Sequence, residues 1–154
     1  MSTTTAMKTP IMDSGERTTF DTGAVRDMHE GKGRFDLMPL YEIGTAYKDD
    51  VLTYLGMYSE SNNPGNIRLA LEVFLDTIPF KHDALLNLAV HFENGAKKYG
   101  EYNWQKGIPK QSFVDSACRH YVKFRAGWTD EDHQSAFLWN MFCLLWTVRN
   151  IKEE

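Results

Sequence analysis

The chain has 154 residues, of which 42% are hydrophobic and 13% aromatic, so it can close one core, whereas two independent domains would both be undersized. A formal net charge of −4 argues against non-specific binding to nucleic-acid backbones, which needs an excess of Lys and Arg. No apolar run reaches the roughly 18 residues of a membrane helix, and the polar start MSTTTAMKTP lacks the apolar segment of a signal peptide. We therefore expect a cytoplasmic protein that binds neither nucleic acid nor membrane.

The first part of the chain differs in composition from the rest. Residues 1–35 are rich in Ser, Thr, Gly and charged residues and show no hydrophobic period, which indicates an N-terminal arm or long loop. Residues 36–154 are expected to form a single helical domain. Pro39 suits the first turn of a helix, and apolar residues then recur every three to four positions as far as Leu55. After the turn-forming stretch SESNNPGN, Asn66 is placed to cap the next helix.

The remaining elements are also predicted to be helical. Asp83 can cap a helix that carries an apolar stripe. Gly and Pro residues then interrupt the pattern, so residues 100–109 are expected to form a loop before a helix over about 110–126. A last helix should run from about Asp130 to Asn150. No long stretch alternates with period two, and we predict an all-α fold, a bundle of four to five helices.

Polar residues on the helix over 110–126 lie on one stripe. Asp115, Arg119 and Lys123 recur every four residues and can support one another as ion pairs. The stripe is either a solvated face or a cationic surface for phosphate oxygens. His120 lies one position round from it, where a histidine is more often a hydrogen-bonded packing residue than a catalyst.

Polar residues also punctuate the last helix. The acidic triplet Asp130, Glu131 and Asp132 lies at its positive end, where carboxylates are favoured. His133 and Asn140 share one face, two turns apart. Because Asn140 lies within the run FLWNMFCLLW, its amide must find partners, and it either bridges a neighbouring helix or lines a polar pocket.

The segment ENGAKKYGEYNWQKG, at the end of the helix before the 100–109 loop, is rich in charged and aromatic residues. Glu93 and Lys97 have the spacing and order of a stabilising pair on an exposed helix. Tyr99, Tyr102 and Trp104 can stack on a nucleobase or can cover the core as amphipathic aromatics.

Two further features are less specific. In the arm, Lys32 lies between two glycines, and Arg17, Arg26 and Arg34 are spread along the same region; backbone N–H groups with basic side chains can cradle phosphate, although the P-loop spacing is missing. Cys118 and Cys143 both lie in apolar helical patterns, which indicates reduced core thiols rather than a disulfide or metal ligands.

Taken in chain order, four segments resemble a known phage family. The arm segment GAVRDMHEGKGRFDLMPL, the loop NGAKKYGEYNWQKGIP, the helix DSACRHYVKF and the segment DEDH with the following WN are similar to the MazZ-type dATP/dGTP diphosphohydrolases. These belong to the MazG-like all-helical nucleotide pyrophosphohydrolases, and the resemblance covers about residues 14–147. It implies a MazG-like bundle in which residues 36–154 form a nucleotide-binding domain.

The resemblance also implies an activity. Such an enzyme hydrolyses purine (deoxy)nucleoside triphosphates to monophosphate and pyrophosphate with Mg²⁺ or Mn²⁺, and shapes the nucleotide pool in phage infection within the host cytoplasm. It would be a homo-oligomer, a dimer or tetramer. The cations are held by helix carboxylates and activate or orient the attacking water.

The resemblance, together with the chemistry of each side chain, gives a set of candidate site residues. The candidate catalytic residues are Glu131, Asp132 and His133. The candidate metal ligands are Glu93, Glu131, Asp132 and Asp115. The candidate nucleotide-binding residues are Lys32, Arg34, Lys98, Tyr99, Asn103, Trp104, Arg119, His120, Lys123 and Asn140, of which Arg34, Lys98, Arg119 and Lys123 are expected to contact phosphate.

Other functions share much of this pattern. The ExxE and ExxD metal motifs typical of MazG-like enzymes are missing from every expected helix. A non-catalytic nucleotide-binding protein, for example a phage protein that sequesters a host signalling nucleotide, would use the same basic and aromatic residues without converging carboxylates. A plain helical scaffold, in which these polar groups satisfy one another, is a third interpretation.

Overall fold

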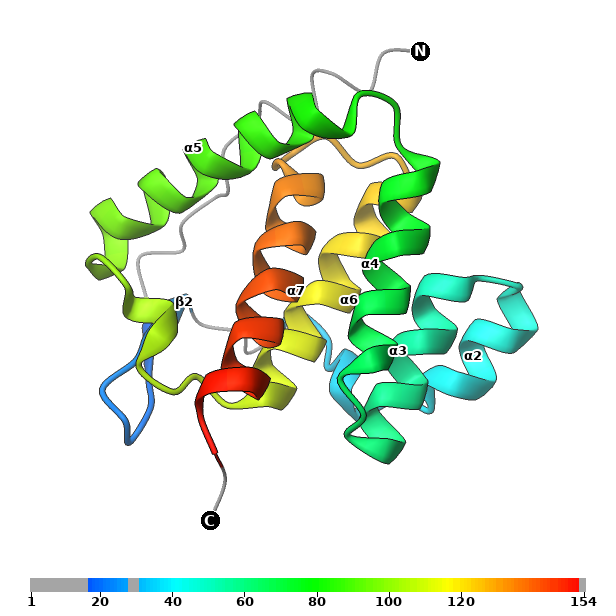
Figure 1. The fold of residues 1–154 in the computed structure, drawn as a ribbon, viewed down its shortest axis with the longest axis horizontal. Helices are drawn as coiled ribbons and strands as arrows, with labels where there is room; N and C mark the ends of the chain where they lie inside the picture. Colours follow the sequence, from blue (N-terminus) through cyan, green and yellow to red (C-terminus); the bar gives the residue numbers. More distant parts are fainter. Residues whose placement is uncertain (1–16, 28–30, 153–154) are drawn as a thin grey trace.

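The protein is an all-helical bundle, as predicted (Figure 1). The computed structural model describes residues 17–27 and 31–152, and none of the helices in these ranges is long and apolar enough to cross a membrane. The helices of the described residues are α2 (Leu40–Tyr47), α3 (Asp50–Ser61), α4 (Gly65–Thr77), α5 (Lys81–Tyr99), α6 (Lys110–Arg125) and α7 (His133–Asn150), with the short 3-10 helices η1 (Phe35–Leu37) and η2 (Asn103–Gln105).

The first predicted helix is two helices, which raises the number from the expected four or five to six α-helices among the described residues. Lys48 adopts a left-handed conformation with φ 53° and ends α2. Asp49 then caps α3 by accepting a hydrogen bond from the Leu52 N–H at 3.2 Å. The two helices fold back tightly, since a Cβ atom on Gly56 would lie 2.2 Å from the backbone nitrogen of Tyr41. Glycine at this position therefore allows the hairpin of α2 and α3.

Two predicted helix caps are wrong. Helix α4 begins at Gly65 with Pro64 before it, so Asn66 lies inside the helix, where its amide donates to the Ser61 hydroxyl at 3.3 Å. Helix α5 begins two residues before Asp83, which therefore lies in the first turn instead of capping it. A carboxylate there still interacts favourably with the helix dipole.

The core lies mainly along the contact of α6 with α7, against which α3 and α4 pack. Phe74 of α4 is buried between Tyr121 of α6 and Phe137 of α7, with ring centroids 6.0 and 4.5 Å away. Cys118 and Cys143 are buried free thiols in this core, as predicted. Helix α5 lies at an angle to this group and contacts α7 (Figure 1).

The described part of the arm contains a small hairpin that the sequence did not indicate. Strand β1 (Arg17–Thr19) pairs antiparallel with β2 (Val25–Asp27). The hairpin turn is tied to the loop before α6, because the Thr22 hydroxyl donates to the Gly107 carbonyl at 3.0 Å. The predicted 100–109 loop is present and includes η2. Residues 1–16 of the predicted arm lie outside the described residues.

Candidate functional site

Three candidate residues from α6, α7 and the turn between them meet at one end of the bundle. His120 on α6 and His133 at the start of α7 approach to 2.9 Å between their Nδ1 atoms. Glu131, in the turn before α7, lies with its Oε2 atom 3.9 Å from the Nδ1 atom of His133. One ligand atom from each of the three residues lies within 4.8 Å of the others. We call His120, Asp130, Glu131 and His133 the histidine cluster.

Asp130 orients His133. The Nε2 atom of His133 lies 2.7 Å from Oδ1 of Asp130, and because an ionised carboxylate only accepts, Nε2 bears the hydrogen and donates a hydrogen bond. The Nδ1 atom of His133 then has a lone pair that faces His120 and Glu131. A carboxylate that fixes a histidine tautomer in this way is the usual support of a metal-binding imidazole. The sequence analysis placed Asp130 at the helix end without assigning it to the site.

The charge state of the cluster follows from its surroundings. Burial lowers the pKa of His120 well below its usual value, and a positive charge on His133, Arg119 or Lys123 lowers it further. His120 is therefore neutral at pH 7 and able to donate a lone pair. Partial burial alone would raise the pKa of Asp130, but the hydrogen bond with His133 and the charge of that ring lower it. The Lys123 ammonium lies 5.1 Å from the centre of the Trp128 ring beside this cluster.

Asp132, a candidate for catalysis and metal binding, caps α7. Its Oδ1 atom accepts a hydrogen bond from the Ser135 N–H at 3.0 Å, so its carboxylate is directed at the helix backbone. Burial raises the pKa of Asp132 to about 6, an effect that the hydrogen bond with Ser135 opposes. The helix consequently starts at His133, three residues later than predicted.

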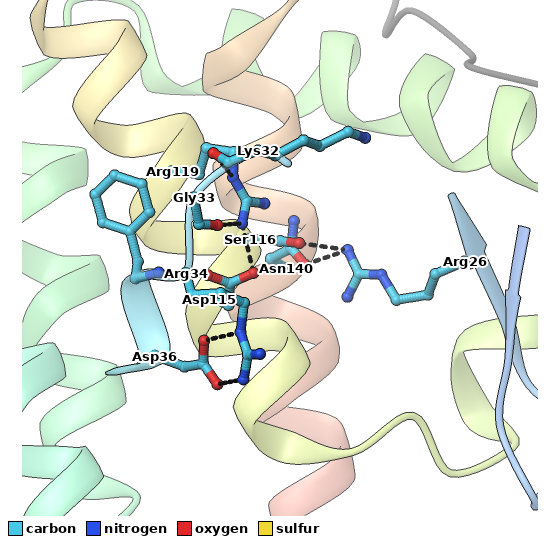
Figure 2. Close-up of polar contacts among 10 residues, drawn as sticks. Arg26, Lys32, Gly33, Arg34, Asp36, Asp115, Ser116, Arg119 and Asn140 are labelled. Carbon is cyan, nitrogen blue, oxygen red and sulfur yellow. Dashed lines mark hydrogen bonds and ion pairs between the residues drawn. The ribbon is translucent and has the colours of Figure 1, made fainter. Parts of the chain in front are cut away.

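Two residues of the predicted stripe on α6, Asp115 and Arg119, are buried under the arm (Figure 2). Arg119 is only 4% exposed and donates to the carbonyls of Lys32 at 3.3 Å and Gly33 at 2.7 Å, and to Asp115 at 2.5 Å. The other carboxylate oxygen of Asp115 accepts from the Phe35 N–H at 2.6 Å. The expected ion pair therefore exists, and it fastens residues 31–37, which we call the strap, across α6.

The strap carries two more candidate residues at its surface. Arg34 makes two hydrogen bonds of 2.8 Å to Asp36, and its side chain is 48% exposed. The hydrogen bond and the charge of Asp36 raise the pKa of Arg34. The Lys32 side chain extends away from the Arg119 guanidinium (Figure 2).

Asn140 links α7 to the hairpin. Its amide nitrogen donates to the Ala136 carbonyl at 2.8 Å, and its oxygen accepts from Arg26 on β2 at 2.9 Å. The same Arg26 nitrogen donates to the Ser116 hydroxyl on α6 at 3.0 Å. Asn140 therefore bridges α7 to the arm. The bridge expected from the sequence was to a neighbouring helix.

The candidate residues at the end of α5 lie in several settings. Trp104 packs between Phe92 and Trp146, with ring centroids 5.8 and 5.2 Å away, so it covers the core. The Arg17 guanidinium lies 4.9 Å from the centre of the Tyr99 ring. Asn103 is buried in η2, and Lys98 is exposed. Glu93 lies away from the histidine cluster and forms the predicted exposed pair with Lys97 at 3.4 Å.

The structure also brings forward His91, which the sequence analysis did not name. Its ring lies 6.0 Å from the Trp139 ring of α7. Burial lowers the pKa of His91 to about 4, and the charges of Lys98 and Arg26 lower it further. His91 in turn lowers the pKa of His120. The charge of Arg26 thus acts on His91, and a charge on His91 acts on His120. The signal in the sequence is a polar residue one turn after Leu88 on the buried face of α5.

This pattern predicts that acid destabilises the protein. The unfolded chain protonates His91 below about pH 6.5, whereas the folded protein does so only near pH 4, so stability is lost as the pH falls through this window. From pH 7 to pH 5 we expect His91 to account for a loss of about 1–2 kcal/mol in the free energy of unfolding, at about 1.4 kcal/mol per pKa unit. Urea titrations at the two pH values should show a smaller loss for His91→Gln.

The comparison with the variant isolates His91. Asp132, with its raised pKa, acts in the opposite direction because the folded protein takes up its proton first, but it is present in both proteins. Equal pH dependence of stability in the wild type and in His91→Gln would show that His91 does not stay neutral in the folded protein.

Comparisons with known proteins were made against family models, curated proteins and solved structures. A family model described as dATP/dGTP diphosphohydrolase, N-terminal, matches residues 62–154. This range spans α4 to α7 and includes the whole histidine cluster, whereas the hairpin and the strap precede it. No curated protein and no solved structure matches.

Proposed function

The chain belongs to the dATP/dGTP diphosphohydrolase family, and we propose that it hydrolyses purine nucleoside triphosphates between the α and β phosphates. The bond from the water oxygen to the α phosphorus forms, the α–β bridging bond breaks, and monophosphate and pyrophosphate leave. The observation that carries the proposal is the convergence of His120, Glu131 and His133 within the segment that the family model matches.

The proposed reaction centre has the donors for one divalent cation. Two imidazole nitrogens and one carboxylate oxygen converge, His120 is neutral, and Asp130 holds the tautomer of His133 that leaves its Nδ1 atom able to coordinate. Of Mg²⁺ and Mn²⁺, this donor set suits Mn²⁺ better, because Mg²⁺ prefers oxygen ligands and imidazole suits transition metals. A cation here would neutralise phosphate charge and lower the pKa of bound water.

The surrounding side chains have assignable tasks. The Lys123 ammonium acts on both His120 and Asp130 of the cluster, and we assign it to bind the phosphate oxygens. We assign Lys98, on α5, to the same task. In this proposal Asp130 keeps His133 in the tautomer that would coordinate the cation, and the Glu131 carboxylate would accept the proton of the attacking water. Proton transfer to a positioned side chain typically accelerates such a step by about 10²-fold to 10⁴-fold.

Other candidate residues receive positioning roles in this proposal. Arg119 and Asp115 hold the strap, and their donors and acceptors face the protein. Asp132 begins α7 and so sets the direction of His133. Glu93 is not part of the reaction centre. The proposed role in the cell, shaping the purine deoxynucleotide pool during phage infection in the host cytoplasm, rests on the family resemblance.

The test separates hydrolysis from binding alone. The protein is incubated with each deoxynucleoside triphosphate and Mn²⁺ or Mg²⁺, pyrophosphate release is measured, and calorimetry measures binding in parallel. We expect pyrophosphate from dATP and dGTP, with higher rates in Mn²⁺. Binding without turnover under all conditions would contradict the enzyme and favour a nucleotide-sequestering protein.

We also propose that the protein is a homo-oligomer formed through α5. Leu85, Leu86 and Val90 on the outer face of this helix are 57%, 69% and 54% exposed, and Phe80 just before it is 81% exposed. Several large apolar side chains exposed on one helix are typical of an interaction site. An antiparallel second copy of α5 would cover these residues by a two-fold symmetric contact. A monomeric mass by light scattering at micromolar concentration would contradict the proposal.

A further inference from the structure

Arg26 reaches from the hairpin into the contact of α6 with α7 (Figure 2). One terminal nitrogen, Nη2, donates to both Ser116 and Asn140. The other, Nη1, is buried and has no hydrogen-bond acceptor among the described residues. Burying a charged donor without a hydrogen-bond partner costs more free energy than burying a neutral donor without one. This nitrogen therefore marks the place of an acceptor that the described residues do not provide.

The guanidinium is held in place by its surroundings. The rings of Phe113 and Trp139 each lie 5.5 Å from the Cζ atom of Arg26, close enough for cation–π attraction. Burial lowers the pKa of Arg26 to about 10, so it keeps its positive charge at neutral pH. With two aromatic rings and two hydrogen-bonded side chains around it, the fork is fixed before any ligand arrives.

The local charges favour an anion. The positive charges of Lys98 and Arg26 both act on His91, which is itself neutral at pH 7. Asp115 is the acid whose charge acts on Arg26, but its carboxylate is already bonded to Arg119 and to the Phe35 N–H. A phosphate oxygen fits a guanidinium donor better than a neutral acceptor does, because the hydrogen bond is charge-assisted.

We propose that the Nη1 atom of Arg26 binds a phosphate oxygen and that the ligand is the pyrophosphate part of the substrate. The identity of the ligand rests on the proposed function. Asn140, which holds Arg26, lies seven residues after His133, about 10 Å along the helix at 1.5 Å per residue. A phosphate at Arg26 is therefore a different group from the one attacked at the histidine cluster. The arm thereby contributes to a site on the helical bundle.

Pyrophosphate alone, in the presence of EDTA, tests this site by calorimetry on the full chain. The wild type should bind it, and Arg26→Lys should bind about tenfold more weakly, because an ammonium cannot keep the bonds to Ser116 and Asn140 while presenting a further fixed donor. Arg149→Lys, at an exposed position in the last turn of α7, makes the same change outside the site and should bind as the wild type does. Equal affinity of Arg26→Lys and the wild type, or no binding by the wild type, would overturn the proposal.

A second measurement avoids any effect of the substitution on folding. In the wild type, NMR titration of His91 should show its pKa rise from about 4 when pyrophosphate binds, because the anion offsets the charges of Arg26 and Lys98. Binding without a change at His91 would place the anion elsewhere and contradict the proposal.

The two proposals can fail separately. Pyrophosphate binding that depends on Arg26, without hydrolysis of any triphosphate, would remove the enzyme and leave this site. Hydrolysis of a triphosphate together with pyrophosphate binding that does not depend on Arg26 would support the enzyme and remove the proposed site at Arg26.

Discussion

Replacing Glu131 by Gln is expected to lower kcat by about a hundredfold or more, the range in which loss of a catalytic carboxylate falls. The Glu131 side chain is 12% exposed and lies 3.9 Å from the Nδ1 atom of His133, so its charge is directed at the reaction centre. Gln keeps the shape of the side chain and removes the negative charge that would help to hold the cation and accept the proton of the attacking water. Steady-state kinetics with dATP and dGTP would measure the loss.

The control is Glu72→Gln, an exposed position on α4, which should keep wild-type kcat. Thermal unfolding of the Glu131→Gln protein should resemble that of the wild type, which separates loss of chemistry from loss of fold. Unchanged kcat in a folded Glu131→Gln protein would exclude Glu131 from the reaction.

The largest effect on stability is expected for Arg119→Ala. The substitution leaves Asp115, which is 5% exposed, as a buried charge without its partner, and breaking such a pair usually costs about 3–5 kcal/mol. The strap also loses the hydrogen bonds to the carbonyls of Lys32 and Gly33. Urea denaturation would measure the free energy of unfolding.

Two further variants test whether the loss of stability comes from leaving the Asp115 charge unpaired in the interior. Arg119→Met combined with Asp115→Leu should recover much of the stability, because it removes both buried charges together. Arg34→Ala breaks an exposed pair of the same kind and should change stability by at most about 1 kcal/mol. An Arg119→Ala protein that is as stable as the wild type but binds nucleotide poorly would instead assign Arg119 to phosphate.

Sequence reasoning recovered the parts of the fold that depend on local spacing. The apolar face of the last helix predicted α7, and the Gly and Pro residues between 100 and 109 predicted the loop before α6 and the start of α6. The spacing of four residues also predicted the Asp115–Arg119 and Glu93–Lys97 pairs. In each case the partners are neighbours on one helix, so helical geometry alone decides the contact.

The break between α2 and α3 could not be predicted in this way. The apolar pattern continues through the break, and the left-handed residue that ends α2 is Lys48, whereas a glycine would have signalled the end. The close approach of the two helices at Gly56 depends on packing between segments, which spacing within one segment does not encode.

The burial of Asp115 and Arg119 on α6 could not be predicted from the sequence either. A stripe of Asp, Arg and Lys has the pattern of a solvated face, and only the strap, from more than 80 residues earlier in the chain, makes Arg119 and Asp115 buried. Arg26 illustrates the same limit, because its partners Ser116 and Asn140 come from two helices distant in the sequence. His120 and His133 were both identified as candidates, but their direct contact required the antiparallel packing of α6 on α7.

The measurement that tests the central claim most directly is a ³¹P NMR time course of dATP and dGTP with Mn²⁺ and a catalytic concentration of the 154-residue chain, quenched with EDTA. The proposed function predicts that the triphosphate signals disappear while the monophosphate and pyrophosphate signals grow in equal amounts, and that His133→Ala abolishes both. Appearance of diphosphate and inorganic phosphate, or unchanged triphosphates with a folded wild-type protein, would contradict it.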